Sequence, residues 1–251
     1  MVGGPRVAWR RGARTRGLTP LSPARFPRAV VFDLDGTLID SASDIALALA
    51  RTLDEVGLSA FDVDTVKTMI GGGSRKLIER ALAARGQAAE LDLVDRMRDA
   101  FERLYLAEPC RHTRVFAGAI DLLDALVARG VGLGICTNKP AEITGRLLAA
   151  LGLDRYFSAV AAGFDGVPKK PDPTMLLTVL SRLGTKPAES VLLGDSAADV
   201  GCARAGGCPV VLVSFGYAGG NAVALGPDAV IDVFSEAVPV LARLFAKAPV
   251  K

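Results

Sequence analysis

Two aspartates separated by one residue follow an apolar stretch near the start of the sequence. Residues 29–32 (AVVF) lead directly into residues 33–37 (DLDGT). In an extended strand, residues i and i+2 point to the same side, so Asp33 and Asp35 are expected to project together at the strand end. Two carboxylates this close repel and raise each other's pKa. Either a cation stabilises them or one of them holds a proton, and both arrangements are typical of catalytic chemistry.

Three further polar stretches follow predicted strands. They are residues 137–139 (TNK), 169–173 (KKPDP) and 194–199 (GDSAAD). The carboxyl ends of parallel strands converge at one edge of a sheet, so these side chains are expected to meet Asp33 and Asp35. Hard oxygen ligands without His or Cys suit Mg²⁺. A hydroxyl, an amide and an ammonium beside such an ion suit a phosphate group.

Each stretch taken alone also has a purely structural interpretation. Asp35-Gly36 is a common turn, and Ser196-x-x-Asp199 is the pattern of a helix capping box. Lys170 can be an ordinary loop lysine, and Asn138 an ordinary turn residue. Their joint occurrence at successive strand ends favours one shared site over four unrelated turns.

Composition excludes several classes of protein. The chain has 251 residues, of which 50% are hydrophobic, enough for one α/β domain with an insertion or for two modest domains. No apolar run approaches the ~20 residues of a membrane helix. The four cysteines form neither CxxC nor a zinc-ligand spacing, which is typical of reduced thiols in a cytoplasmic protein. The single histidine, His112, argues against a His-dependent triad.

The charge is concentrated in residues 1–28, which hold seven arginines and no acid. Removing those seven from the 30 basic residues leaves 23 against 27 acids, so the body carries a net charge of about −4. The overall positive charge is therefore no sign of nucleic-acid binding. Residues 1–28 are expected to form a disordered tail. An Arg-rich leader without acids resembles an organelle transit peptide, and a solvated tail and a start codon assigned too early are the alternatives to that interpretation.

The rest of the chain alternates between short apolar runs and helical patterns. The predicted strands are residues 29–34, 131–136, 158–162, 190–194, 209–214 and 229–233. They are almost continuously hydrophobic, as in a parallel sheet buried on both faces. Helical stripes such as Ile143, Leu147, Leu148 and Leu151 separate them. This rhythm predicts a doubly wound α/β core with right-handed crossovers.

The rhythm breaks between residues 41 and 115, where the pattern is wholly helical. Further helical stretches are predicted at about 62–69, 74–85 and 91–107. We expect residues 41–115 to form a helical cap domain, and residues 29–40 with 116–251 to form the core. The cap follows residues 33–37 directly, and this position places it over the edge of the sheet where open α/β sheets bind ligands.

Together these motifs resemble the haloacid dehalogenase superfamily of phosphohydrolases, and within it the phosphoglycolate phosphatase-like family. Residues 32–41 (FDLDGTLIDS) resemble the first family motif, and Thr137 in ICTNKP the second. Lys170 in KKPDP resembles the third, and Asp195 with Asp199 in GDSAAD the fourth. The resemblance runs from about residue 29 to 245. It implies a HAD-like, Rossmann-type fold with an all-helical cap inserted after the first strand.

The resemblance also implies roles for these residues. Asp33 is expected to be the nucleophile that forms an aspartyl phosphate, and Asp35 the general acid and then base. Thr137, Asn138 and Lys170 are expected to bind the phosphoryl oxygens. Mg²⁺ is expected on Asp33, the Asp35 backbone carbonyl and Asp195. Thr37 is expected to lock the turn that carries Asp35, and Asp199 to be an outer ligand or to orient Lys170.

A glycine-rich stretch, residues 71–76 (GGGSRK), precedes a predicted helix in the cap. Glycines allow close backbone approach, and a helix N-terminus favours anions. In the related family this loop faces the active site, so Arg75 could bind a substrate carboxylate. A flexible hinge with a solvated arginine is the alternative. The related loop often carries a polar side chain where this sequence has Gly72.

The expected activity is Mg²⁺-dependent hydrolysis of a small phosphate monoester, 2-phosphoglycolate first among them. Alternatives on the same scaffold are a phosphatase for another small phosphoester or pyrophosphate, a phosphomutase, and a non-catalytic binding protein. A true dehalogenase needs no metal, and Asp35 and Asp195 argue against it. The expected partners are a small phosphorylated substrate and, at most, a second copy of the chain, with no nucleic acid and no membrane.

Overall fold

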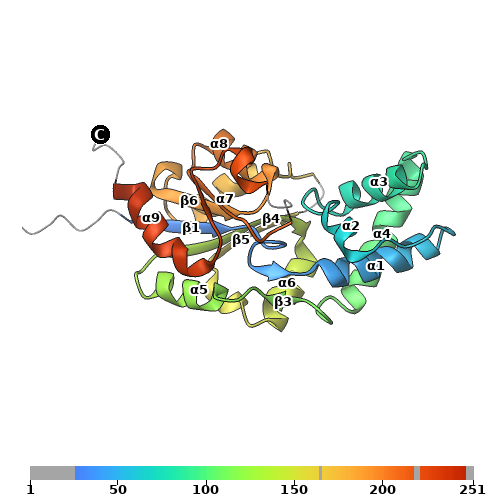
Figure 1. Ribbon diagram of the computed structural model, residues 1–251, viewed down its shortest axis with the longest axis horizontal. Helices are drawn as coiled ribbons and strands as arrows, with labels where there is room; N and C mark the ends of the chain where they lie inside the picture. Colours follow the sequence, from blue (N-terminus) through green and yellow to red (C-terminus); the bar gives the residue numbers. More distant parts are fainter. Residues whose placement is uncertain (1–25, 164–165, 218–220, 247–251) are drawn as a thin grey trace, which may run out of the picture.

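A six-stranded parallel sheet forms the centre of the molecule in the computed structural model (Figure 1). The structure describes residues 26–163, 166–217 and 221–246. In sheet order the strands are β5 (Ala159–Gly163), β4 (Gly132–Pro140), β1 (Ala29–Phe32), β6 (Ser190–Gly194), β7 (Val210–Val213) and β8 (Ala229–Ile231). The predicted parallel α/β core is confirmed. The expected tail of residues 1–28 lies almost wholly outside the described residues.

The strands are apolar because both faces of the sheet are covered. Successive side chains of β1 point to opposite faces, and they belong to two different hydrophobic clusters. Val30 and Phe32 pack in the cluster that contains side chains of α5 (Ala119–Val127), α6 (Ala141–Ala150) and α9 (Ala237–Ala246). Ala29 and Val31 pack in the cluster beneath α7 (Thr174–Arg182) and α8 (Ala197–Gly206). All four side chains have no exposed surface.

A helical insert follows β1 and lies at one end of the molecule, beyond the sheet (Figure 1). Its helices are α1 (Ala42–Asp54), α2 (Val63–Lys67), α3 (Ser74–Ala84) and α4 (Leu91–Ala107). Each longer helix buries one apolar stripe, such as Ile45, Leu49 and Leu53 in α1. None of the helices among the described residues has the length and apolar character needed to cross a membrane.

The stretch predicted to be wholly helical ends in a strand instead. Arg114–Val115 (β3) pairs antiparallel with Ile39–Asp40 (β2), so the two chain segments that enter and leave the insert lie side by side. The pairing depends on contacts between distant segments, and two-residue strands leave no periodic pattern in the sequence. The Asp44 carboxylate reinforces it by accepting hydrogen bonds from the backbone N–H groups of His112 and Thr113 and from the Thr113 hydroxyl, at 2.7–3.0 Å.

Candidate active site

The register of the three central strands brings the predicted site residues to one edge of the sheet. Phe32 at the end of β1 pairs with Ile135 of β4 on one side and Leu193 of β6 on the other. The residues that follow these three positions therefore meet beyond the sheet. The Asp33 backbone N–H donates to the Leu193 carbonyl at 2.9 Å, which holds the first carboxylate in strand-like geometry.

Lys170 joins two of the acidic motifs. Its Nζ lies 2.8 Å from Asp33 Oδ1 and 2.7 Å from Asp199 Oδ1. Its side chain is only 1% exposed. Burial alone would lower the pKa of Lys170, but the charges of Asp199 and Asp33 hold it well above its ordinary value. The lysine therefore stays charged and fixes the nucleophile candidate from one side.

Asp199 has a structural and an electrostatic task at once. Its Oδ2 accepts hydrogen bonds from the Ser196 N–H at 3.1 Å and the Ser196 hydroxyl at 2.6 Å, so Ser196 and Asp199 do form the capping box of α8. Its Oδ1 contacts Lys170. Both interpretations of this motif are thus compatible, because the two oxygens of one carboxylate serve different partners.

Asp195 is held by close backbone packing. Its Oδ2 accepts a hydrogen bond of 2.7 Å from the Tyr217 N–H. A Cβ at Gly36, which has φ +80°, would lie 2.4 Å from Asp195 Oδ2, and one at Gly216 would lie 2.3 Å from Asp195 Cβ. Both glycines are required here on steric grounds. Gly36 belongs to the DLDGT stretch and Gly216 to the loop after β7, so two separate segments pack against Asp195.

Three buried carboxylates form a group that could hold a metal ion. Suitable oxygens of Asp33, Asp195 and Asp199 all lie within 4.8 Å of one another. Burial raises the pKa of Asp33 to about 6; Lys170 opposes this rise and the Asp199 charge adds to it. Burial and the charges of Asp199 and Asp33 raise the pKa of Asp195 well above its ordinary value. An all-oxygen set with excess negative charge suits a hard divalent cation.

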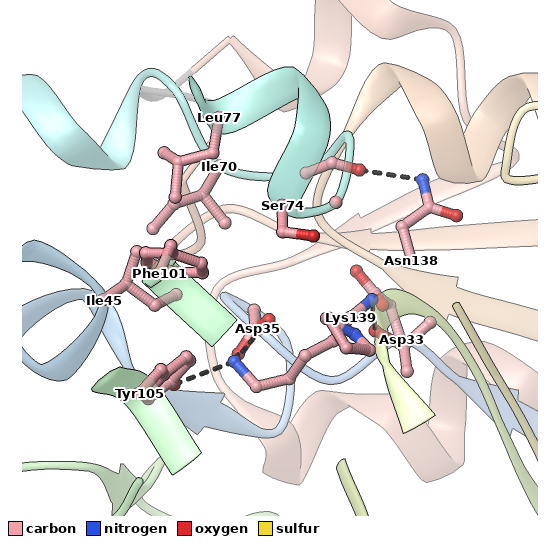
Figure 2. Close-up of a pocket in the computed structure, with 14 residues that line it drawn as sticks. Asp33, Asp35, Ile45, Ile70, Ser74, Leu77, Phe101, Tyr105, Asn138 and Lys139 are labelled. Carbon is pink, nitrogen blue, oxygen red and sulfur yellow. Dashed lines mark hydrogen bonds and ion pairs between the residues drawn. The ribbon is translucent and has the colours of Figure 1, made fainter. Parts of the chain in front are cut away.

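Asp35 faces a small cavity between the core and the insert (Figure 2). Its Oδ1 accepts a hydrogen bond of 2.5 Å from the Ser41 hydroxyl, and its two oxygens lie 3.0 and 3.1 Å from Lys139 Nζ. The cavity also touches Asp33 and Thr137 and has a volume of about 40 Å³. That volume holds only a few water molecules. Both aspartates therefore share one confined space.

Asn138 connects three separate segments. Its Nδ2 donates to the Gly71 carbonyl of the insert at 2.9 Å and to the Lys170 carbonyl at 3.0 Å. Its Oδ1 accepts a hydrogen bond of 2.8 Å from the Lys170 N–H. The glycine loop lies against the same site, since a Cβ at Gly73 would lie 2.9 Å from the Asn138 carbonyl. Asn138 thus positions Lys170 and holds the insert against the core.

Over residues 30–213 the chain matches the family described as haloacid dehalogenase-like hydrolases. The chain belongs to this hydrolase family. A phosphoglycolate phosphatase from Rhodospirillum rubrum is 41% identical over 213 residues, 83% of this chain and 88% of that protein. A phosphoglycolate phosphatase from Yersinia pestis is 38% identical over 215 residues, which are 85% of this chain and 93% of that protein.

Solved structures agree with this assignment. The crystal structure of a predicted phosphoglycolate phosphatase from Haemophilus somnus 129pt has a TM-score of 0.78 at 29% identity, and the match covers 87% of this chain and 99% of that one. Another, from Lactobacillus delbrueckii, has a TM-score of 0.80 at 24% identity, which shows the shared fold. The expected fold of this hydrolase family is thereby confirmed.

Two residues predicted for the hydrolase site have unexpected surroundings. The Arg75 guanidinium forms an ion pair with Asp95 of α4 and does not line the cavity at Asp33 and Asp35. The Thr37 hydroxyl is buried without a hydrogen-bond partner among the described residues, while its backbone N–H donates to Leu34 at 3.2 Å. The turn around Asp35 is therefore held through the backbone and not through that hydroxyl.

Sequence reasoning assigned no role to Lys139 in the hydrolase site. Its side chain is 3% exposed and reaches Asp35 and the Tyr105 hydroxyl of α4. Burial lowers the pKa of Lys139, and the charge of Asp35 opposes this effect. The predicted strand ended at residue 136, so nothing in the sequence indicated that Lys139 belongs to a buried strand, where a lysine needs a charged partner. Its charged partner, Asp35, belongs to the core and its second partner, Tyr105, to the insert, so both contacts join segments distant in the sequence.

Proposed function

We propose that the protein is a phosphoglycolate phosphatase that hydrolyses 2-phosphoglycolate to glycolate and phosphate with the help of Mg²⁺. One observation carries the proposal: Asp33, fixed by Lys170, opens into the same confined cavity as Asp35. The names of relatives at about 40% identity support the choice of substrate. The small volume of the cavity supports a small leaving group.

In the first step, an Asp33 carboxylate oxygen attacks phosphorus and the bond from phosphorus to the ester oxygen breaks. Asp35 gives its proton to the departing alkoxide. Lys170 and the Thr137 hydroxyl bind the phosphoryl oxygens and stabilise their charge. Lys170 suits this role because Asp199 holds its ammonium beside Asp33 in a dry setting. The products are glycolate and an aspartyl phosphate on Asp33.

In the second step, water attacks the phosphorus of the aspartyl phosphate while Asp35 takes up one of its protons. The bond from phosphorus to Asp33 breaks, and inorganic phosphate leaves. Both carboxylates return to their starting states. Asn138 contributes by holding the Lys170 backbone and the Gly71 loop, which keeps bulk water out while the insert is closed.

For the metal, we propose Asp33, the Asp35 backbone carbonyl and Asp195 as ligands. The carboxylate group fits a divalent ion because its negative charge exceeds what Lys170 alone can balance. Asp199 is better suited to orienting Lys170, since both of its oxygens already have close partners. Bound magnesium would offset the charge of the carboxylates and of the phosphoryl oxygens.

We also propose a cytoplasmic location and a monomeric or homodimeric state. All four cysteines are free, and three of them are buried, which agrees with a reducing compartment. Light scattering during size-exclusion chromatography measures the oligomeric state directly. A molar mass above that of a dimer would overturn this part of the proposal.

The decisive test is phosphate release from a panel of esters, with Mg²⁺ and with a chelator. The panel contains 2-phosphoglycolate, sugar phosphates, nucleotides and pyrophosphate. We expect a Mg²⁺-dependent preference for 2-phosphoglycolate, lost in Asp33→Asn and kept in the exposed control Asp92→Asn. Preference for another ester would keep the chemistry and reject the substrate. Bisphosphate-dependent isomerisation without phosphate release would identify a phosphomutase instead.

A further inference from the structure

Lys139 lies inside the cavity that holds the catalytic aspartates (Figure 2). It extends from β4, two residues after Thr137, and its ammonium reaches Asp35. There it contacts both Asp35 oxygens, at 3.0 and 3.1 Å, and the Tyr105 hydroxyl at 2.8 Å. The ammonium also lies 4.4 Å from the centre of the Tyr105 ring. It is therefore held at the boundary between core and insert.

The wall that the insert contributes to this cavity is mostly apolar. Among the described residues, Lys139 is the one cationic side chain that lines the cavity. The insert contributes Gly71, Gly73 and Ser74 to the cavity wall and, in larger part, the side chains of Ile45, Ile70, Leu77, Phe101 and Tyr105. An anionic group placed against such walls without a counter-charge would be strongly disfavoured. Of the described side chains that line this cavity, Lys139 is therefore the one whose charge can balance a second negative charge on a substrate.

We propose that Lys139 is the residue that binds the carboxylate of the substrate and so selects phosphate esters of 2-hydroxy acids. This inference rests on the proposed phosphatase activity. In such an ester, one carbon atom separates the ester oxygen from the carboxylate carbon. If Asp35 faces the ester oxygen, the substrate carboxylate lies one carbon atom further from phosphorus. Lys139, in contact with Asp35, occupies that position.

Substrate binding would exchange one carboxylate partner of Lys139, that of Asp35, for another, that of the substrate. The ammonium has three N–H donors; Asp35 and Tyr105 use them without substrate. A substrate carboxylate can take over donors from Asp35 while Tyr105 keeps its own contact. The ammonium then bridges substrate and insert, so a carboxylate substrate also favours the closed arrangement. Arg75 is not needed for this task, since its guanidinium pairs with Asp95 outside the cavity.

The test compares two substrates of similar shape, 2-phosphoglycolate and ethyl phosphate, in which a methyl group replaces the carboxylate. The measured quantity is the ratio of their kcat/KM values. We expect Lys139→Met to lower this ratio about 100-fold, because a buried charge pair is lost with one substrate only. Lys139→Arg, which keeps the charge, should restore part of the ratio. Lys169→Met, a matched loss of a nearby lysine outside the cavity, should change it less than about threefold.

Product inhibition gives a second and independent readout. In Lys139→Met, inhibition by glycolate should weaken by at least tenfold, whereas inhibition by inorganic phosphate should stay within about threefold. Equal losses for both substrates and both products would show that Lys139 only supports Asp35, and would overturn the inference. A wild-type protein with no preference for 2-phosphoglycolate over ethyl phosphate would instead reject the proposed substrate, so the two failures are distinguishable.

Discussion

The side-chain amide of Asn138 donates a hydrogen bond of 2.9 Å to the Gly71 carbonyl, and this bond joins core strand β4 to the loop before α3. The same amide also holds the Lys170 backbone through its second donor and its oxygen. The position of the insert and the position of Lys170, the proposed phosphate-binding residue, thereby depend on the same side chain. One side chain, Asn138, therefore contacts both the insert and the segment that carries Lys170.

Replacing Asn138 by Ala should make the Gly71 loop and the Lys170 backbone more mobile. The change leaves the Gly71 and Lys170 carbonyls and the Lys170 N–H without their buried partner, at a cost of about 1–3 kcal/mol for each unsatisfied group. We expect faster amide exchange in residues 71–76 and a fall in kcat/KM of about 10–100-fold. Gln87→Ala, at an exposed position, is the control. Unchanged exchange in the loop would show that this hydrogen bond does not hold the insert.

Replacing Lys170 by Met should damage both stability and activity. Asp33 and Asp199 would remain buried without their cation, so the free energy of unfolding should fall by about 3–5 kcal/mol. Catalysis should fall by about 10²–10³-fold or more, because a donor to the phosphoryl oxygens is gone. Urea unfolding and phosphate release measure the two effects. The exposed Lys186→Met should show neither, and a stable, active Lys170→Met would refute the assigned role.

Gly216→Ala should weaken metal binding without replacing a proposed ligand, because it displaces Asp195. A Cβ at this position would lie 2.3 Å from Asp195 Cβ and 2.6 Å from the Gly36 carbonyl, so Asp195 must shift. We expect a higher Mg²⁺ concentration at half-maximal activity. The matched change Gly145→Ala lies in the exposed middle of α6 with no atom within 4 Å of the new Cβ, and should stabilise by up to about 1 kcal/mol. Equal metal dependence in both variants would contradict the steric argument.

The metal-free protein should lose stability as the pH rises through the range of the Asp33 titration. The pKa of Asp33 is raised from its ordinary value of 3.8 to about 6, so between these values the folded state binds more protons than the unfolded state. Stability then falls with rising pH across about pH 4–6. Asp33→Asn removes this contribution, so the difference between the two proteins isolates it.

Chelator-treated protein and the Asp33→Asn variant are compared by urea unfolding at several pH values. The wild-type curve should descend relative to the variant curve over this window. Saturating Mg²⁺ should reduce the difference, since a bound cation stabilises the ionised carboxylate. Parallel curves in the absence of metal would show that Asp33 titrates at its ordinary value.

Much of the core could be predicted from the sequence because its signals are local. Apolar runs too short for helices predicted the six parallel strands, and their ends agree with the structure within a few residues in most cases. β4 is the exception, since it continues to Pro140 through an irregular pairing with β5. The placement of Asp33 and Asp195 at one edge followed from their positions directly after predicted strands, because parallel strands end at the same edge of a sheet.

The remaining features depended on how distant segments pack. The pairing of β2 with β3 and the contact between Lys139 and Asp35 each join parts of the chain more than 70 residues apart. The direction of Arg75 toward Asp95 likewise depends on how α3 packs against α4. The sequence by itself therefore determined the sheet, the order of the motifs and the acidic character of the site. Only the tertiary structure decided which cation enters the cavity, because the contacts of Lys139 with Asp35 and of Arg75 with Asp95 arise from packing between distant segments.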